Sequence, residues 1–329
     1  MTRIVVVDTM GGLGDLLLGM PIVEALCRSH PDAEVTVVTT APWHVLLERD
    51  ERIHRVVPVE GRDGAAVEAA ARPVLERLRP ELAITTNRQH GLPALLERTA
   101  QRAVTDLWRS PPVDERVDLR MLRLLAEDGV IDRAFTTLPP RVVLGDDERA
   151  AGRRLLGGLT AGRPAILMPD SGMRVKHWPL GAWGDLAGGL ARRGWAPIVV
   201  SQVAEQRAAL AEAGAVVAPD LAVRALAALC AAAGERDGRA VGGDTGPVRL
   251  AAASGLAVVG LFGPTVSSRY GYRGRAVNLQ GFPECPVRTP TAVPDQECWW
   301  TARCPLTEDH SPRCMADIGV GQVLAAVAA

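Results

Sequence analysis

No stretch of the 329-residue sequence approaches the roughly eighteen consecutive apolar residues of a membrane-spanning helix, so no span is expected. The beginning of the chain lacks the basic, apolar and small-residue regions of a secretory signal, which favours a cytoplasmic location. Net charge is nearly absent too, since 37 Lys and Arg residues are balanced by 38 Asp and Glu residues. Without a bulk positive field the protein is not attracted to nucleic acid or to anionic membranes, and any phosphate contact has to be local.

Common cofactor and hydrolase signatures are missing as well. The stretch DTMGGLGDLLLGMP (8–21) fits a dinucleotide fingerprint at Gly12 and Gly14, but Leu17 occupies its third glycine position. The next predicted strand ends in two threonines, where that fingerprint requires an acid. No P-loop lysine follows the glycines, and the G-x-S-x-G motif of many serine hydrolases does not occur. These absences exclude the usual NAD, FAD and P-loop sites at this turn.

What the sequence contains is a regular alternation of apolar strands and helices. Continuous apolar runs such as RIVVVD are typical of parallel strands that are buried on both faces. Strands are predicted at 3–8, 34–40, 55–60, 82–87 and 102–107, and again at 164–170, 196–202, 215–220, from 241 and at 256–262. The alternation predicts an α/β fold with two Rossmann-like domains, whose parallel sheets face each other across a cleft.

Two domains are also expected from the length, which exceeds the size at which one core usually keeps growing. Paired prolines within 136–147 interrupt the alternation before a helix that starts near Asp146. We therefore place an N-terminal domain at 1–140 and a C-terminal domain at 141–329. Ligands of such folds bind beyond the carboxyl ends of the strands, so the loops there form the candidate site.

The first of these loops brings Asp15 into the first turn of a helix. An aspartate at this position caps the helix and stabilises it by roughly 0.5–2 kcal/mol, so a structural role is open beside a catalytic one. The second loop, in MPDSGMRVKHWPLGAW (168–183), offers Ser171, Gly172 and Lys176. A hydroxyl, a glycine and a cation favour a phosphate site, and a solvated basic loop is the alternative.

The third loop lies in VGGDTGPVRLAAASG (241–255), where a strand turns into a helix. The helix N-terminus presents unpaired N–H groups and the positive end of the helix dipole, which attract an anion. Thr245 and Gly246 would hold a phosphate oxygen, with Arg249 one turn further on the accessible face. Asp244 would repel the anion, so it is expected to cap the helix or to orient the loop.

Three segments of the chain together resemble glycosyltransferase family 9, the ADP-heptose-type heptosyltransferases, which are inverting enzymes. They are GLGDLLLGMPIVEAL, VKHWPLGAW and GGDTGPVRLAAASG with the following VVGLFGPT, and the resemblance spans residues 3 to 325. It implies the GT-B architecture, with an acceptor-binding N-terminal domain and a C-terminal domain that binds a nucleotide-diphosphate sugar. The implied donor is ADP-heptose, and no cofactor is required for transfer. The acceptor stays open among a saccharide, a natural product and a protein.

The resemblance also implies roles for individual residues. Asp15 takes the position of the catalytic base, on an acceptor-side loop with Gly12 and Gly14. The donor-binding positions are Ser171, Gly172, Lys176, Glu205, Asp244, Thr245, Gly246 and Arg249. Among these, Lys176 would contact the diphosphate and Glu205 the ribose. The family usually has His where this chain has Arg249, which keeps a cation there but does not titrate near pH 7, so the sugar and the base of the donor stay open.

Four of the six cysteines lie in one segment rich in Pro, Asp and Trp, at Cys285, Cys298, Cys304 and Cys314. The other two, Cys27 and Cys230, are expected in the cores of helices. Four thiols in a cytoplasmic protein favour a structural Zn or Fe site over disulfides. The gaps of twelve, five and nine residues contain no C-x-x-C pair, however, and lie outside the usual zinc patterns. Some members of the family bind iron here and many carry the cysteines without metal, so both outcomes stay open.

Two other functions remain compatible with the sequence. One is a nucleotide-sugar-binding protein that has lost transfer, for which Arg249 is the supporting feature. The other is a nucleotide-sugar epimerase or hydrolase of the same architecture, which would form product without an acceptor. On the N-terminal loops, Arg88, Arg102 and Arg109 would suit an acidic acceptor or would simply be solvated.

Overall fold

The structure is a computed structural model that describes residues 2–9, 11–61, 63–88, 91–109 and 111–329. The chain divides into two compact units. Unit 1 comprises Met1–Pro111 and Val117–Val143, and unit 2 comprises Pro112–Arg116 and Leu144–Ala329. The short segment 112–116 therefore belongs to unit 2, although residues of unit 1 precede and follow it in the sequence. The single boundary predicted at 140–141 does not account for this segment.

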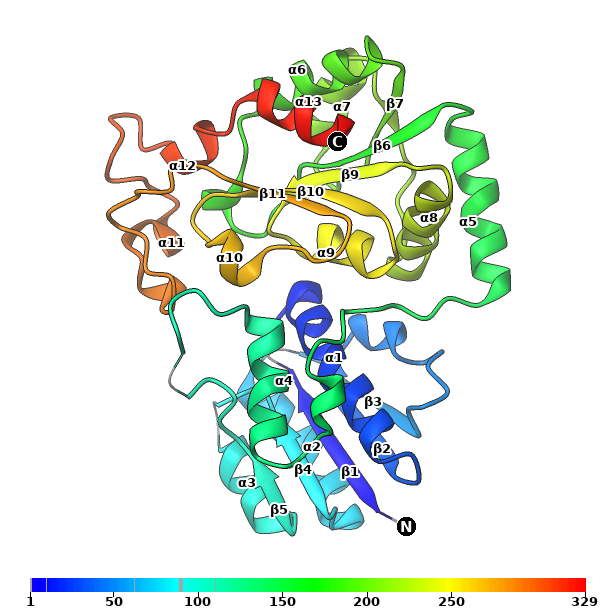
Figure 1. Ribbon diagram of the computed structural model, residues 1–329, viewed down its shortest axis with the longest axis vertical. Helices are drawn as coiled ribbons and strands as arrows, with labels where there is room; N and C mark the ends of the chain where they lie inside the picture. Colours follow the sequence, from blue (N-terminus) through cyan, green and yellow to red (C-terminus); the bar gives the residue numbers. More distant parts are fainter. Residues whose placement is uncertain (1, 10, 62, 89–90, 110) are drawn as a thin grey trace. The chain divides into compact units, whose positions relative to one another are not determined.

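Unit 1 is built on a five-stranded parallel sheet in the order β3-β2-β1-β4-β5 (Figure 1). Its strands are β1 (Arg3–Asp8), β2 (Glu34–Thr40), β3 (Arg55–Val59), β4 (Leu82–Thr85) and β5 (Arg102–Val104). Its helices are α1 (Leu13–Ser29), α2 (Gly64–Leu78), α3 (Leu92–Thr99) and α4 (Val117–Glu127), with the short turns η1 (Trp43–Leu46) and η2 (Arg133–Phe135). The central strand is β1, which is buried from Ile4 to its last residue, Asp8.

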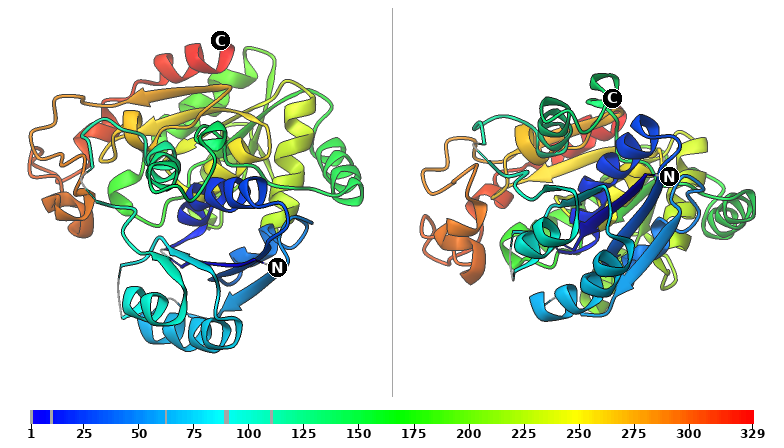
Figure 2. Two further views of the ribbon diagram at one scale, coloured as in Figure 1. Left: turned by 60° about the horizontal axis from the view of Figure 1, so that its bottom comes forward. Right: turned by 90° about the horizontal axis from the view of Figure 1, so that it is seen from below.

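Unit 2 is built on a six-stranded parallel sheet in the order β11-β10-β9-β6-β7-β8. Its strands are β6 (Arg163–Met168), β7 (Trp195–Val199), β8 (Val216–Val217), β9 (Arg239–Gly243), β10 (Ala257–Phe262) and β11 (Ala276–Gln280). Its helices are α5 (Asp146–Leu159), α6 (Leu180–Ala191), α7 (Ala204–Glu212), α8 (Val223–Glu235), α9 (Gly246–Ala253), α10 (Ser267–Tyr270), α11 (Glu297–Thr301), α12 (Arg313–Ala316) and α13 (Val320–Ala328), with the short turns η3 (Arg174–Lys176) and η4 (Val293–Asp295). The helices α5 and α8 pack together at one end of this unit, and the cysteine-rich segment with α11 lies at the other end (Figures 1 and 2).

The predicted fold class is confirmed, because the chain is an α/β protein with two parallel sheets. Two strands differ from the expectation. The strand predicted at 215–220 is reduced to β8, a two-residue strand at one edge of its sheet. At the opposite edge, β11 is not predicted, since its residues are mostly half-buried and include polar ones. In the described part of the chain no helix is long and apolar enough to cross a membrane.

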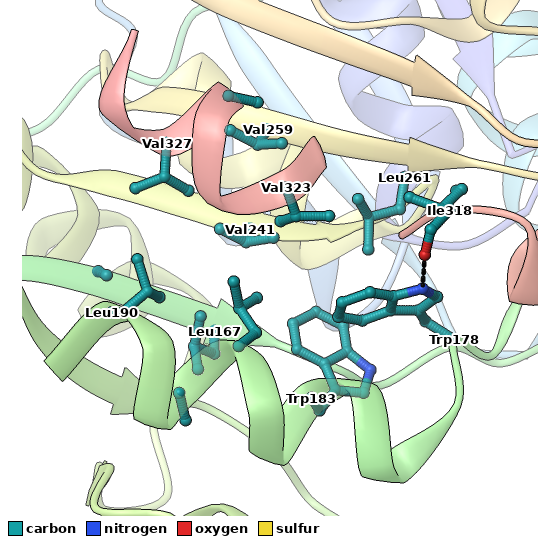
Figure 3. Close-up of a cluster of buried hydrophobic side chains, with 14 of the residues drawn as sticks. Leu167, Trp178, Trp183, Leu190, Val241, Val259, Leu261, Ile318, Val323 and Val327 are labelled. Atoms are coloured by element: carbon teal, nitrogen blue, oxygen red, sulfur yellow. Dashed lines mark hydrogen bonds between the residues drawn. The ribbon is translucent and has the colours of Figure 1, made fainter. Parts of the chain in front are cut away.

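The core of unit 2 holds the loop between β6 and α6 in place (Figure 3). Trp178 is 4 % exposed, and its ring packs edge-on against Trp183 with 5.1 Å between the ring centroids. Its Nε1 donates a hydrogen bond to the Ile318 carbonyl oxygen at 2.9 Å. The Trp-Pro pair of the sequence therefore anchors this loop to the core, and with it Lys176, two residues earlier.

Candidate active site

A buried carboxylate holds two cations together beyond the ends of β6 and β9. Lys176, the sole lysine of the sequence, places Nζ 2.9 Å from Asp244 Oδ2 and 3.0 Å from the Asp244 carbonyl oxygen. The Arg249 guanidinium donates to Asp244 Oδ1 and to the Tyr270 carbonyl oxygen. The side chains of Lys176, Asp244 and Arg249 are only 13 %, 8 % and 9 % exposed. Together these three side chains carry one net positive charge.

The two cations decide the ionisation of Asp244. Burial by itself would raise the pKa of this carboxyl, but Lys176 and Arg249 outweigh burial and hold the pKa well below its usual range. Asp244 therefore orients cations and does not cap α9, whose N-cap residue is Thr245. The expectation that Arg249 lies on the accessible face of the helix is wrong, because its guanidinium turns inward to Asp244 and Tyr270.

The N-terminus of α9 begins directly after this cluster. The Thr245 amide donates to the Tyr272 hydroxyl at 3.4 Å, and that hydroxyl donates to the Gly243 carbonyl oxygen at 2.6 Å. Thr245 Oγ1 is buried and has no hydrogen-bond partner among the described residues. Buried polar atoms normally have a partner, so this hydroxyl is able to take a further hydrogen bond. Gly246 is the first residue of the helix, as a phosphate-binding turn requires.

Ser171 and Gly172 lie in the loop that leads from β6 to Lys176. Ser171 Oγ accepts a hydrogen bond from the Met173 amide at 3.2 Å, and the Ser171 carbonyl oxygen is 3.0 Å from His177 Nε2. A Cβ atom added at Gly172 would meet nothing within 4 Å. The backbone at Gly172 is therefore open to a ligand.

Asp170 ties this loop to the one that follows β7. Its carboxylate accepts hydrogen bonds from Ser201 Oγ at 2.5 Å and from the Gln202 amide at 2.6 Å. Glu205 follows in the first turn of α7, where it is exposed. Within the described ranges it makes no hydrogen bond or ion pair with Lys176 or Asp244, and its contact to a ribose stays a prediction.

The cysteine-rich segment reaches the same lysine, since the Trp299 ring centroid lies 5.1 Å from Lys176 Nζ. All four clustered cysteines line one cavity of about 10 Å³ and carry free thiols; they are Cys285, Cys298, Cys304 and Cys314. Burial raises the pKa of the Cys314 thiol to about 12. Among the described residues no group of three or more His, Cys, Asp or Glu side chains is arranged to hold a metal ion.

In unit 1 the turn after β1 places Asp15 where a helix cap is expected. Asp15 Oδ2 accepts a hydrogen bond at 2.9 Å from the amide of Gly12, the N-cap residue of α1, and Gly14 is the second residue of that helix. A Cβ atom added at Gly11 would lie 2.1 Å from Asp15 Oδ2, so only glycine leaves room for the carboxylate. Asp15 therefore caps the N-terminus of α1, as the structural interpretation of this residue predicts. This capping role does not exclude a catalytic one, because a carboxylate accepts several hydrogen bonds.

A second carboxyl, which the sequence does not single out, lies at the end of β1. Asp8 is 4 % exposed, and its Oδ1 accepts a hydrogen bond from Thr86 Oγ1 at 2.9 Å. Burial raises the pKa of Asp8 to about 7; the Thr86 hydrogen bond opposes this shift and the charge of Asp15 adds to it. Asp8 and Asp170 share one signal in the sequence, since each is an acid at or just after the end of a buried strand.

The three arginines considered for an acidic acceptor all have partners within unit 1. Arg88 pairs with Asp106, and Arg102 donates to the Asp128 carbonyl oxygen. Arg109 donates to both carboxylate oxygens of Asp128 at 2.8 Å. Carboxylates therefore compensate the charges of Arg88 and Arg109, whereas Arg102 is held by a backbone oxygen.

The sequence model of glycosyltransferase family 9 (heptosyltransferase) matches residues 101–283. That range contains every donor-side candidate from Ser171 to Arg249 and leaves out Asp15. No curated protein sequence matches the chain.

Solved structures with the same fold include three bacterial proteins. A glycosyltransferase family 9 protein from Veillonella parvula has a TM-score of 0.78 at 19% identity, over 99% of this chain and 96% of that one. The ADP-heptose LPS heptosyltransferase II of E. coli has a TM-score of 0.69 at 18% identity, over 100% and 98%. The iron-containing dodecameric glycosyltransferase TibC of enterotoxigenic E. coli has a TM-score of 0.63 at 16% identity, over 99% and 75%. These likenesses identify the α/β fold as that of GT-B heptosyltransferases.

Proposed function

The chain belongs to glycosyltransferase family 9, and from that membership we propose that it transfers a sugar from a nucleotide diphosphate to an acceptor hydroxyl with inversion. We propose an ADP-linked heptose as the donor, since one structure of the same fold is named an ADP-heptose heptosyltransferase. The acceptor is a saccharide, a natural product or a protein. With six free cysteines, the protein is expected to act in the reducing cytoplasm.

The cluster of Lys176, Asp244 and Arg249 is the observation that supports a diphosphate site most directly. Its excess positive charge lies next to the N-terminus of α9, where the first N–H groups lack partners within the helix. The buried Thr245 hydroxyl adds a further hydrogen-bond donor. A leaving diphosphate gains negative charge as the glycosidic bond breaks, and preorganised cations and N–H groups lower the free energy of that transition state.

Asp15 is the proposed general base. It accepts the proton of the acceptor hydroxyl while the hydroxyl oxygen attacks the anomeric carbon from the face opposite the diphosphate, which inverts that carbon. The hydrogen bond from the Gly12 amide fixes the orientation of the carboxylate. One positioned base contributes on the order of 10²–10⁴ in rate.

The two alternatives make different products. A binding protein that has lost transfer binds the donor without turnover, and an epimerase or hydrolase converts the donor in the absence of any acceptor. Arg249, the feature that kept the first alternative open, is held by Asp244 and still supplies a positive charge at the helix N-terminus. The usual histidine is therefore not needed to keep a cation at this position.

Calorimetric binding of ADP, GDP, UDP and ADP-heptose tests the donor site. We expect one diphosphate to bind selectively and its affinity to fall about tenfold to a hundredfold in Lys176→Ala, as for the loss of one charge-assisted hydrogen bond. Asp15→Asn should bind the donor like the wild type. Arg192→Ala, at the exposed C-cap of α6, controls for the loss of a surface cation. If no diphosphate binds, or if Lys176→Ala binds unchanged, the proposed donor site is wrong.

We also propose that the four clustered cysteines hold one structural Zn or Fe ion. The donor set fits, because four thiols surround a single small cavity in one segment. Their arrangement in the described residues is not a coordination geometry, so metal binding would draw the sulfurs closer. Such an ion would brace the segment that places Trp299 over Lys176 and would take no part in the reaction.

Elemental analysis of the purified chain tests this metal site. One ion per chain is expected in the wild type and in Cys27→Ser, whose thiol lies in α1 of unit 1 and is not one of the four clustered cysteines. Cys298→Ser should lose the ion. A wild-type chain without Zn or Fe, when purified without chelators, would refute the proposal.

A further inference from the structure

Asp8 has a buried oxygen without a partner, directly beside α1. Its Oδ1 accepts the Thr86 hydrogen bond, whereas its Oδ2 is buried and has no hydrogen-bond partner in the described part of the chain. An unsatisfied buried acceptor is unfavourable, so its presence calls for an explanation beyond packing.

Gly19 places this carboxyl against the same face of α1 as the proposed base. A Cβ atom added at Gly19 would lie 2.2 Å from Asp8 Oδ2, so the carboxyl occupies the space that any other residue would need. Asp15 precedes Gly19 by four residues, and residues four apart lie on one face of a helix. The Asp8 carboxyl therefore lies against α1 one helical turn after Asp15, whose charge acts on it.

Asp15 is also the charged group that acts on Asp8. Two residues at this strand end are neutral, namely Thr39 opposite Asp8 on β2 and Thr86 just beyond β4. Burial raises the pKa of Asp8 to about 7, the Thr86 hydrogen bond lowers it and the Asp15 charge raises it. Asp8 thus changes its charge near neutral pH.

We propose that Asp8 is a positioning residue that sets the proton affinity of Asp15 through its own ionisation. Protonated Asp8 presents Asp15 with a neutral neighbour. When Asp8 releases its proton to solvent, its negative charge makes Asp15 bind a proton more strongly, and the effect is reciprocal because both sites share one interaction energy. The consequence for catalysis rests on the proposed role of Asp15, since a stronger base accepts the acceptor proton more readily.

Carboxyl ¹³C NMR of the full chain, labelled at aspartate Cγ, tests the pair directly. The Asp8 signal, assigned by its absence in Asp8→Asn, should titrate near pH 7. Its midpoint should fall in Asp15→Asn, which removes a negative neighbour, and rise in Thr86→Val, which removes the hydrogen bond to the carboxylate. Thr86→Ser keeps the hydroxyl and should keep the wild-type midpoint. The proposal is overturned if the Asp8 midpoint equals that of the exposed aspartates, or if Asp15→Asn leaves the Asp8 midpoint unchanged.

The pH dependence of kcat for sugar transfer separates this proposal from the function on which it rests. Wild-type kcat should rise about threefold to tenfold as Asp8 ionises, and Asp8→Asn should stay at the lower value across this range. A purely structural role for Asp8 would lower kcat without changing the shape of the profile, and would refute the coupling. If Asp15→Asn transfers at the wild-type rate, Asp15 is not the base, while the NMR titration still decides whether the two carboxyls are coupled.

Discussion

Asp244 and Asp8 are both buried aspartates at strand ends, one in each unit, yet their charges differ near neutral pH. Two cations keep Asp244 ionised against the effect of burial. Asp8 has one hydroxyl donor and one negative neighbour, so burial dominates and the carboxyl retains its proton up to about pH 7. The charged and hydrogen-bonding partners of a buried carboxyl, more than its burial, decide its ionisation. With cations beside it the carboxyl stays ionised and holds them in position, and without them it takes up or releases a proton near neutral pH.

The raised pKa of Asp8 predicts a pH-dependent gain in stability for Asp8→Asn. Between pH 3.8 and about 7 the folded chain keeps a proton at Asp8 that the unfolded chain has lost. Rising pH therefore lowers the free energy of unfolding through this window. Asparagine does not ionise, so Asp8→Asn should be more stable than the wild type at pH 8. We expect its free energy of unfolding to be about 2–4 kcal/mol higher at pH 8 and nearly equal at pH 4. Urea denaturation at both pH values measures this; equal effects at both would refute the raised pKa.

The loops of unit 2 are held in place by the core and by one another. Trp178 anchors the segment with Lys176 to the core, and Asp170 ties that segment to the loop after β7. Gly172 stands in this otherwise fixed loop with open space where a side chain would be.

Gly172→Ala should therefore weaken donor binding without weakening the fold. If the diphosphate approaches the backbone here, a methyl group in its path should lower the affinity for the donor about tenfold, or 1.4 kcal/mol. Gly181→Ala in α6, where an added Cβ also meets nothing within 4 Å, is the matched control and should bind normally. Calorimetry and thermal unfolding of both variants check this, and unchanged donor affinity in Gly172→Ala would place the phosphates elsewhere.

The sequence predicts the elements of this fold better than the contacts between them. Strands such as β1 and β6 are predicted because burial on both faces requires continuous apolar runs, whereas β11 at the sheet edge does not need one. The pair of Lys176 and Asp244 joins residues 68 positions apart, which no local pattern encodes. The inward turn of Arg249 depends on that same pair and is missed for the same reason.

At the scale of the whole molecule, the proposed mechanism needs no metal ion at the diphosphate, because Lys176 and Arg249 of unit 2 supply the positive charge there. Transfer should therefore continue within about twofold of its rate after brief treatment with EDTA, because fixed cations already stabilise the leaving group. A rate that collapses with EDTA and returns with Mg²⁺ would contradict this. Slow loss of activity that only Zn or Fe restores would instead indicate the cysteine site.

The most direct measurement follows from Lys176 being the sole lysine of the chain. In a chain labelled with ¹³C at the lysine Cε, one side-chain NMR signal reports on the proposed diphosphate contact. We predict that ADP shifts this signal in a saturable way, with the affinity found by calorimetry, and that adenosine leaves it in place. A signal that stays unchanged while ADP binds would show that the diphosphate lies away from Lys176, and the proposed donor site would have to be abandoned.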